Sequence, residues 1–133
     1  MGKFNLEILT PGKKFYQGEV DMVIVPGIEG EHGILVDHVP VVIALKDGIL
    51  KIQVGNEWKQ AAIHGGFIQV EHKESIIMSD AIEWPEEIDV NRAISAKERA
   101  EERLRQQLSQ VEYIRSKAAM ARAMARLRIT KEI

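Results

Sequence analysis

Apolar and polar residues alternate in short stretches from residue 4 to residue 82. The first stretches carry Phe4, Leu6 and Ile8, and then Val20, Met22 and Ile24. A period of two is typical of strands that bury one face, and turn residues such as Thr10-Pro11-Gly12 and Pro26-Gly27 separate the stretches. The pattern predicts about nine or ten strands and no helix in this region, arranged as a sandwich or a barrel.

Three pairs of neighbouring stretches have the turn residues of β-hairpins between them. The predicted pairs are 41–45 with 49–54, 49–54 with 57–63, and 67–70 with 75–78. Asp47-Gly48 and Gly55-Asn56 stand in the first two turns, and both dipeptides favour the positive φ that tight turns need. The third turn contains His72-Lys73-Glu74. Hairpins of this kind predict an antiparallel sheet.

Two glycine-rich segments interrupt the strands. Residues 27–33, with the sequence Gly-Ile-Glu-Gly-Glu-His-Gly, have the look of a phosphate-binding loop. They lack the Gly-Lys-Ser/Thr ending of that motif and no helix follows, so we expect a loop that crosses between sheets. His64-Gly65-Gly66 predicts a bend before a strand, where glycine permits an unusual φ or a close approach of backbones.

The pattern changes at Trp84-Pro85, the predicted boundary between a β-domain over residues 1–84 and a helical domain over residues 85–133. The proline ends the last strand, and Asp89 is the predicted N-cap of a helix. Apolar positions then recur every three or four residues at Val90, Ala93, Ile94, Ala100, Leu104 and Leu108, and again at Val111, Ile114, Ala118, Ala121, Met124 and Ala125. A short break near Ser109 predicts two helices that form a hairpin.

The predicted face between these helices is rich in alanine. Alanine allows the two helices to approach closely but buries little apolar area, and burial contributes only about 25 cal/mol per Å2. The hairpin would therefore be marginally stable alone. We expect a mobile element that packs on the sandwich in one state and on a partner in another.

Composition narrows the class of protein. The chain of 133 residues is 45% hydrophobic and 29% charged, which is typical of a folded, soluble protein. It has no cysteine, which excludes disulfides and thiolate metal sites and suits a reducing compartment such as the cytoplasm. No apolar run approaches the roughly 20 residues that span a bilayer, and the first residues lack the apolar core of a signal peptide. We expect any association with a membrane to be indirect.

Charge is divided unevenly along the chain, although the net charge is only -2. Residues 1–84 carry 7 Lys and Arg against 12 acidic residues, whereas residues 85–133 carry 11 against 8. Nucleic-acid-binding domains usually combine a strong basic surplus with aromatic residues for stacking, and aromatic residues are only 5% of this chain. We therefore predict no nucleic-acid partner.

No group of residues predicts catalysis. Neither a nucleophile with a neighbouring base nor a metal cluster has a credible spacing. The histidines are His32, His38, His64 and His72, and they form no HxxxH or HExxH motif. Because zinc ligands recur at such spacings, we predict no metal site and expect all four histidines in turns or at strand ends.

Arginines form two evenly spaced sets in the helical region. The first set is Arg92, Arg99 and Arg103, and the second is Arg115, Arg122 and Arg126. Spacings of seven and four place each set on one face of a helix. Three interpretations are open: a polyphosphate held between the sets, a basic face for an acidic segment of a partner, or a solvated face relieved by pairs such as Glu101 with Arg105. The pattern alone favours the solvated face.

Three motifs occur in an order and at a spacing that are specific to one family. They are Thr10-Pro11 followed by a strand, Gly30-Glu31-His32-Gly33-Ile34-Leu35 with His38-Val39-Pro40 after it, and Gly65-Gly66-Phe67 leading to Val70. With these motifs the whole chain resembles the epsilon subunit of bacterial rotary proton-translocating ATP synthases. It departs at Val36-Asp37, near which the family usually has a proline, and at His64, where the family often has serine.

The resemblance implies a fold and a role. The fold would be α+β, with a ten-stranded antiparallel β-sandwich followed by an antiparallel hairpin of two helices. The chain would be a non-catalytic subunit of the central stalk, and so not an enzyme, that helps couple proton flow to ATP synthesis. Its sandwich would bind the gamma subunit and the ring of c subunits, as a peripheral protein at the cytoplasmic face of the cell membrane.

The resemblance also implies that the hairpin regulates the complex. Folded down against the sandwich, the hairpin would permit ATP hydrolysis. Extended along the gamma subunit, it would insert toward the alpha and beta subunits and inhibit hydrolysis. Arg115, Arg122 and Arg126 would then face acidic residues of the catalytic head.

Some members of the family bind ATP on the folded-down hairpin through the motif Ile/Leu-Asp-x-x-Arg-Ala, which Ile88-Asp89-Val90-Asn91-Arg92-Ala93 matches in full. ATP would be a regulatory ligand here, since the chain needs no catalytic cofactor. By this resemblance the base would lie near Glu83, Ile88 and Asp89, and the phosphates would be held by Arg92, Arg99, Arg122 and Arg126. The match raises the polyphosphate interpretation above that of a solvated face.

An alternative function needs neither nucleotide nor rotary partner. The same pattern suits a stand-alone β-sandwich adaptor whose helical tail binds another protein. Co-purification with a gamma subunit would separate this adaptor from the rotor subunit.

Overall fold

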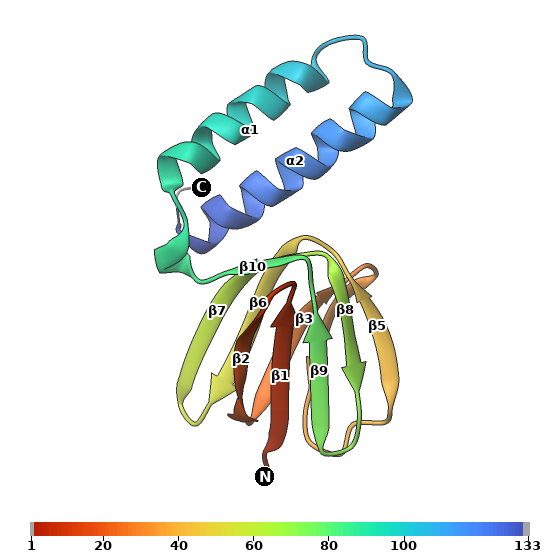
Figure 1. Cartoon of the computed structure of the whole chain (residues 1–133), viewed down its shortest axis with the longest axis vertical. Coiled ribbons are helices and arrows are strands. Elements are labelled where there is room, and N and C mark those ends of the chain that lie inside the picture. The colour runs from red at the N-terminus through yellow and green to blue at the C-terminus, as the bar shows by residue number, and fades with distance from the viewer. Residues whose placement is uncertain (1, 132–133) are drawn as a thin grey trace.

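Two structural units follow one another in the computed structural model, which describes residues 2–131 (Figure 1). The first contains the strands β1 (Phe4–Thr10), β2 (Lys13–Val20), β3 (Met22–Gly27), β4 (Gly30–Ile34), β5 (Val41–Leu45), β6 (Gly48–Val54), β7 (Glu57–His64), β8 (Gly66–Val70), β9 (Glu74–Met78) and β10 (Ala81–Glu83). The second contains a short 3-10 helix, η1 (Pro85–Glu87), and the helices α1 (Val90–Leu104) and α2 (Gln110–Ile129). The predicted α+β fold, ten strands followed by a helical hairpin, is confirmed.

The sheet folds over itself into two layers. Its strands lie in the order β10, β7, β6, β3, β5, β8, β9, β1, β2, and β4 pairs with β3 beside this path. In Figure 1, β1 and β9 lie in the nearer layer and β6 in the farther one. The pairing of β1 with β9 is parallel, whereas the other pairings are antiparallel. The predicted antiparallel arrangement therefore holds for every pairing but one, and that one joins strands that no hairpin connects.

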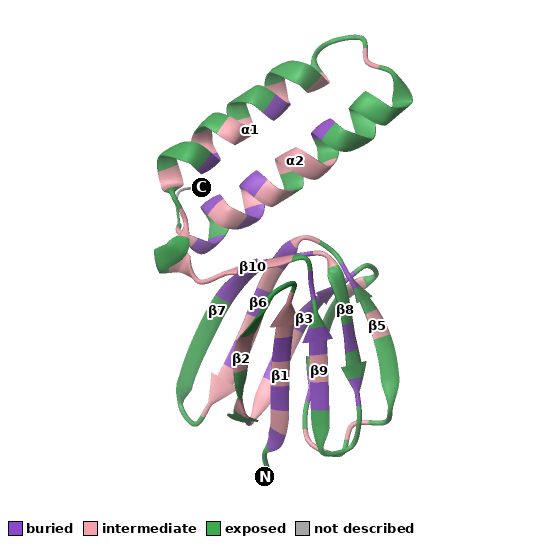
Figure 2. Cartoon of the chain, in the orientation of Figure 1, coloured by how far each residue is buried: buried purple, intermediate pink, exposed green. Residues whose placement is uncertain are grey.

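Alternating residues fill the space between the layers. Phe4, Leu6 and Ile8 of β1 are at most 3% exposed, as the alternation predicts. Buried residues of the other strands pack with them in one core: Val20, Val23, Val25, Ile34, Leu45, Leu50, Ile52, Ala61, Ile63, Ile68, Val70, Ile77 and Ile82. Figure 2 shows buried positions along the strands, while much of each helix is exposed.

The predicted phase of β3 is wrong. The alternation placed Met22 and Ile24 in the core, but both are only half-buried, and Val23 and Val25 are fully buried instead. Val20 belongs to the end of β2 rather than to the same strand. Because all four residues from 22 to 25 are apolar, the sequence carries no alternation that could set the phase.

The glycine-rich segment 27–33 is a hairpin and not a crossing loop. Gly27 pairs with Gly30, so only Ile28 and Glu29 lie outside the ladder between β3 and β4. His32 consequently lies within β4, which corrects its predicted place in a turn or at a strand end. The glycines that suggested an open loop instead permit a tight two-residue turn.

Both helices begin where the sequence predicts. The Asp89 side chain accepts a hydrogen bond from the backbone N–H of Arg92 at 3.1 Å, and Ser109 accepts one from that of Glu112 at 3.2 Å. Leu108 is not part of the first helix, because α1 ends at Leu104. Neither helix within residues 2–131 is long and apolar enough to cross a membrane.

The predicted inner face of α2 is wrong in part, whereas Ala125 is buried as predicted. Val111 and Ile114 are 58% and 59% exposed, and Ala121 is exposed as well. The buried residues are Ser116, Ala123, Ala125, Leu127 and Ile129. They do not form one stripe because α2 contacts α1 and also the strands β6 and β7. The C-terminal half of α2 therefore buries two faces, while its first turns remain largely exposed.

Candidate functional site

A cavity lies where the hairpin meets the end of the sandwich. Its volume is about 330 Å3, and it is lined by Glu83, Glu87, Asp89, Arg92, Ala93, Ala96, Arg99 and Arg126. We call it the junction cavity, because β10, η1, α1 and α2 each contribute to its wall. Three guanidinium groups and three carboxylates line the same space.

Stacked aromatic rings hold the linker between the two units. The Trp84 ring stacks on the Phe15 ring of β2, with centroids 4.6 Å apart and planes at 25°. Tyr16 meets Trp84 edge to face at 6.4 Å between centroids. The Glu87 carboxylate accepts a hydrogen bond from the backbone N–H of Trp84 at 2.8 Å and so closes the turn of η1. Aromatic pairs of this kind contribute about 0.5–1.5 kcal/mol beyond area burial, which fixes the start of the hairpin beside β10.

α1 presents two arginines to the cavity from one face. Arg92 and Arg99 are separated by seven residues, which is close to two helical turns, and Ala96 lies between them. The Asp89 cap fixes the first turn and so the position of Arg92. Alanine at positions 93 and 96 leaves space between the arginine side chains. The sequence thus builds a cationic wall along α1.

Glu83 joins the sandwich to α2. Its Oε1 accepts a hydrogen bond from Arg126 Nε at 2.7 Å and lies 3.0 Å from His64 Nε2. Burial favours the neutral carboxyl, but the hydrogen bonds from Arg126 and His64 outweigh it and lower the pKa of Glu83 below its ordinary 4.5. Glu83 is therefore ionised at neutral pH. Its contribution to stability is fully present above the ordinary pKa and is lost as the pH falls through the lower pKa of the folded state.

Six of the eight residues predicted for an ATP site line the junction cavity: Glu83, Asp89, Arg92, Ala93, Arg99 and Arg126. Ile88 and Arg122 do not line it. Ile88 follows η1 and Arg122 precedes Arg126 by one turn, and both are half-buried.

Two residues of the cavity were not among those predicted. Ala96 lies four residues after Arg92, so the helical spacing of the motif could have identified it. Glu87 lies in η1, which no hydrophobic periodicity marks. A residue in so short a helix is placed by the tertiary structure and gives no sequence signal.

The remaining arginines of the two sets lie away from the cavity. Arg103 Nε donates to Ser116 Oγ at 3.4 Å, and its guanidinium lies 3.7 Å from the Glu112 carboxylate. These contacts join the two helices near the tip of the hairpin. Arg115 is exposed on α2. Each set of arginines therefore has members at the junction cavity and members nearer the tip of the helical hairpin.

The predicted ion pair between Glu101 and Arg105 is wrong, because Arg105 has a different partner. Arg105 pairs with Glu102 at 3.1 Å rather than with Glu101, because it lies just beyond the end of α1, where the spacing of four no longer applies. Both side chains of this pair are more than 60% exposed, so its contribution is small.

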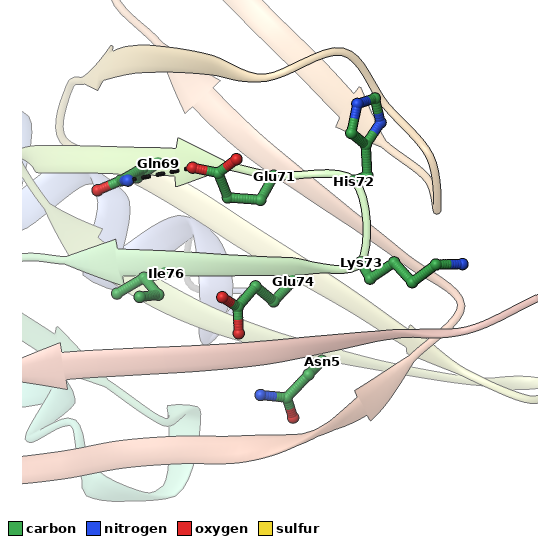
Figure 3. A pocket seen from close by; sticks show the side chains of 7 residues that line it. All are labelled: Asn5, Gln69, Glu71, His72, Lys73, Glu74 and Ile76. Carbon is green, nitrogen blue, oxygen red and sulfur yellow. Dashed lines mark hydrogen bonds between the residues drawn. The ribbon is translucent and has the colours of Figure 1, made fainter.

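A second hollow lies at the other end of the sandwich, near the turn between β8 and β9 (Figure 3). Its volume is about 440 Å3, and it is lined by Asn5, Gln69, Glu71, His72, Lys73, Glu74 and Ile76. Figure 3 shows His72 and Lys73 extending away from the other side chains. Its charged groups do not converge, and in residues 2–131 no group of three or more His, Asp or Glu could hold a metal ion. We do not consider this hollow a candidate site.

Comparison with known proteins assigns the family. The family model described as ATP synthase, Delta/Epsilon chain, beta-sandwich domain matches residues 3–85, and that described as ATP synthase, Delta/Epsilon chain, long alpha-helix domain matches residues 86–131. The chain belongs to the ATP synthase delta/epsilon family. The resemblance that the sequence motifs indicated is thereby confirmed across both units.

Similar proteins support the assignment. The ATP synthase epsilon chain of Ruminiclostridium cellulolyticum is 49% identical over 98% of this chain and 97% of its own. That of Alkaliphilus metalliredigens is 50% identical over 97% of this chain and 96% of its own. A chain in a structure of the Euglena gracilis mitochondrial ATP synthase, with OSCP, F1 and c-ring, matches with a TM-score of 0.84 and 25% identity, over 94% of this chain and 79% of that one. A chain of the Tetrahymena thermophila mitochondrial ATP synthase central stalk and c-ring shares the fold at a TM-score of 0.66 and 16% identity, over 97% of each chain.

Proposed function

We propose that this chain is the epsilon subunit of a rotary ATP synthase, a non-catalytic part of the central stalk that helps couple proton translocation to ATP synthesis. Similarity over nearly the full length to proteins named ATP synthase epsilon chain supports this role. The likeness to a chain in an F1 and c-ring assembly supports it as well. On this proposal the sandwich binds the gamma subunit and the c-ring, at the cytoplasmic face of the membrane.

The rotor role has a direct test. The tagged chain, expressed with the other subunits of its own complex, is expected to co-purify with gamma and to join the c-ring assembly. A chain recovered without gamma would instead support a stand-alone adaptor with a helical interaction tail.

We further propose that the junction cavity binds ATP while the hairpin is docked. The observation that carries this proposal is the convergence of Arg92 and Arg99 from α1 with Arg126 from α2 on one cavity of about 330 Å3. Guanidinium groups pair with phosphate oxygens through two hydrogen bonds, and a polyanion relieves the repulsion between the arginines. Glu83 and Asp89 line the same cavity and can accept hydrogen bonds from the amino group of a base.

Two further residues complete the proposed ATP site. Arg122 lies one turn before Arg126 on α2 and would reach the phosphates by a change of rotamer. Ile88 lies beside the Asp89 cap and would offer an apolar contact to the base. Neither residue lines the cavity itself, so each would contact only the part of a bound ligand that extends beyond it.

ATP would act on the position of the hairpin. A ligand that binds only the docked state stabilises it by about 2.7 kcal/mol at a free concentration one hundred times its dissociation constant. Released from the sandwich, the hairpin would extend toward the alpha and beta subunits and inhibit ATP hydrolysis. Arg115, Arg122 and Arg126 would then face acidic residues of the head. Because Arg122 and Arg126 would serve both states, ATP and the inhibitory contact would compete.

The ATP site is tested by calorimetric titration of the isolated chain with ATP. Saturable binding is expected in the wild type, and Arg92→Ala and Arg126→Ala are expected to weaken it about 10- to 100-fold. That range corresponds to the loss of a charged hydrogen bond worth about 1.5–3 kcal/mol.

Arg105→Ala is the matched control for this titration. It removes an equal charge from the end of α1, but Arg105 pairs with the exposed Glu102 and does not line the cavity. Binding that is unchanged by Arg92→Ala and Arg126→Ala would refute the assignment of the phosphates to these arginines.

A further inference from the structure

His64 occupies a buried position under the hairpin, although histidine is commonly exposed. It is the last residue of β7, and only 6% of it is exposed. Nε2 lies 3.0 Å from the Glu83 carboxylate, and Nδ1 lies 3.7 Å from that of Asp47 in the turn before β6. Nδ1 is fully buried and has no hydrogen-bond partner among the described residues. Among the described residues, the charged group that pairs with Nδ1 is the Asp47 carboxylate.

The geometry at Nε2 indicates which nitrogen carries the proton. At 3.0 Å from an ionised carboxylate, Nε2 must donate, because two acceptors at that distance would repel. In the neutral ring Nδ1 is then an acceptor that faces another anion. A second proton on Nδ1 would remove this mismatch, so the imidazole can take up a proton in place.

Arg126 shares the carboxylate of Glu83 with His64. Both side chains contact the same oxygen, Oε1, with Arg126 Nε at 2.7 Å. Glu83 and Asp47 belong to the sandwich and stay beside His64 whether or not the hairpin is docked. Only Arg126 and the covering surface of α2 arrive when the hairpin docks.

Docking therefore has a definite effect on the proton equilibrium of His64. The arriving guanidinium is a like charge for an imidazolium and takes part of the carboxylate that would stabilise it. The covering helix also removes water, which disfavours the charged ring. Both effects favour neutral His64 in the docked state. By linkage, protonation of His64 must weaken docking by the same factor.

We propose that His64 is a proton-linked latch for the hairpin: neutral His64 permits docking through Glu83 and Arg126, and protonated His64 favours release. The proposal rests on the part of the proposed function that lets the hairpin leave the sandwich, and it does not require ATP. The contribution to docking is present while His64 is neutral and is lost when the imidazole takes up a second proton, so it decreases as the pH falls. Acidification would thus shift the subunit toward the released state.

The first test measures the protonation of His64 by nuclear magnetic resonance. In Arg126→Ala, the ratio of protonated to neutral His64 at one fixed pH is expected to rise about threefold or more, because the competing positive charge is gone. Arg128→Ala is the matched control, because Arg128 is an exposed arginine on the same turn that does not line the junction cavity. The half-buried His38 and the exposed His72 are internal references and should not change. A ratio of protonated to neutral His64 that stays the same or falls in Arg126→Ala would overturn the latch.

The second test measures the position of the hairpin. The chain has no native cysteine, so spin labels can be placed at Asn56→Cys in the turn after β6 and at Gln107→Cys between the helices. On acidification from about pH 8 to about pH 5, the docked fraction is expected to fall, with a change in the docking constant of about threefold or more. His64→Gln keeps an amide donor for Glu83 but cannot be protonated, so its docked fraction should be nearly independent of pH over this range.

Two outcomes of the second test would overturn the latch. One is a pH dependence that persists in His64→Gln, and the other is a hairpin that remains fully docked throughout. Failure of ATP to bind in the calorimetric titration is a separate result. It would remove the nucleotide site and leave both of these measurements unaffected.

Discussion

At the scale of single residues, the double glycine before β8 shows how close the backbones approach in the sandwich. Gly65 and Gly66 have φ values of 72° and 109°, which side chains rarely adopt. A Cβ at Gly65 would meet no atom within 4 Å, whereas a Cβ at Gly66 would overlap the carbonyl oxygen of Met78 in β9. Substitutions at these two positions therefore separate the energetic cost of the left-handed backbone conformation from the cost of a steric overlap with β9.

Substitution of the two glycines should give different losses of stability. Gly65→Ala is expected to lower the free energy of unfolding by about 1–2 kcal/mol, the cost of a left-handed conformation. Gly66→Ala adds an overlap that β9 must move to relieve, so we expect a loss of about 4 kcal/mol. Urea denaturation of both variants measures the difference. Equal losses would show that the sheet accommodates a methyl group at Gly66 without strain.

The sequence identified Glu83 and Arg126 separately but did not predict that they pair. The two residues are 43 positions apart, and their contact depends on α2 returning over the end of β7 and β10. Nothing in helical periodicity fixes that return. His64 was placed correctly at a strand end, but its burial and its contact with Glu83 were not predicted, because the contact depends on the pairing of β10 with β7. Charge networks of this kind become visible only in the tertiary structure.

At the scale of elements, alternation and turn chemistry predicted the strands well, and the predicted hairpins of β6 with β7 and of β8 with β9 are confirmed. The predicted hairpin of 41–45 with 49–54 is wrong, because β5 pairs with β8 and with Gly27 of β3 and not with β6. The predicted strands 41–45 and 49–54 differ from β5 and β6 by at most one residue at an end. Prediction failed where both faces are apolar, as in β3, and where one helix packs on two partners, as in α2. In both cases the residues lack the contrast between faces that periodicity measures.

The start of α2 depends on its cap more than on packing. Ser109 and Glu112 form a reciprocal capping box, with hydrogen bonds of 3.2 Å in each direction, while Val111 and Ile114 nearby are exposed. Because few buried contacts hold these turns, Ser109→Ala should destabilise them by about 1 kcal/mol. Amide hydrogen exchange of the first turns of α2 measures the effect.

Ser95→Ala is the matched control for this cap. Ser95 is exposed in the middle of α1, where alanine has the higher helix propensity, so this variant should slightly increase protection. Equal protection in Ser109→Ala and the wild type would show that tertiary contacts, and not the cap, determine where α2 begins.

At the scale of the whole molecule, apolar burial is concentrated in the sandwich. The one core cluster consists of residues of the strands, whereas the buried residues of α1 are only Ala93 and Ala100. The hairpin contacts the sandwich through α2 and through the ion pair of Arg126 with Glu83. The two units therefore differ in the apolar area that each would expose on opening. This difference favours release of the hairpin without unfolding of the sheet.

Native-state hydrogen exchange can measure this difference. Amides of α1 and α2 are expected to exchange through an opening at least about 2 kcal/mol less costly than the one that exposes β6, whose Leu50 and Ile52 are fully buried. Bound ATP should raise the protection of the helices toward that of β6, by about 2.7 kcal/mol at one hundred times the dissociation constant, and leave the strands unchanged. If helices and strands instead share one opening free energy at every denaturant concentration, the molecule unfolds as one unit. In that case release of the hairpin could not serve as a regulatory step, because each release would also unfold the sandwich that holds the subunit in its complex.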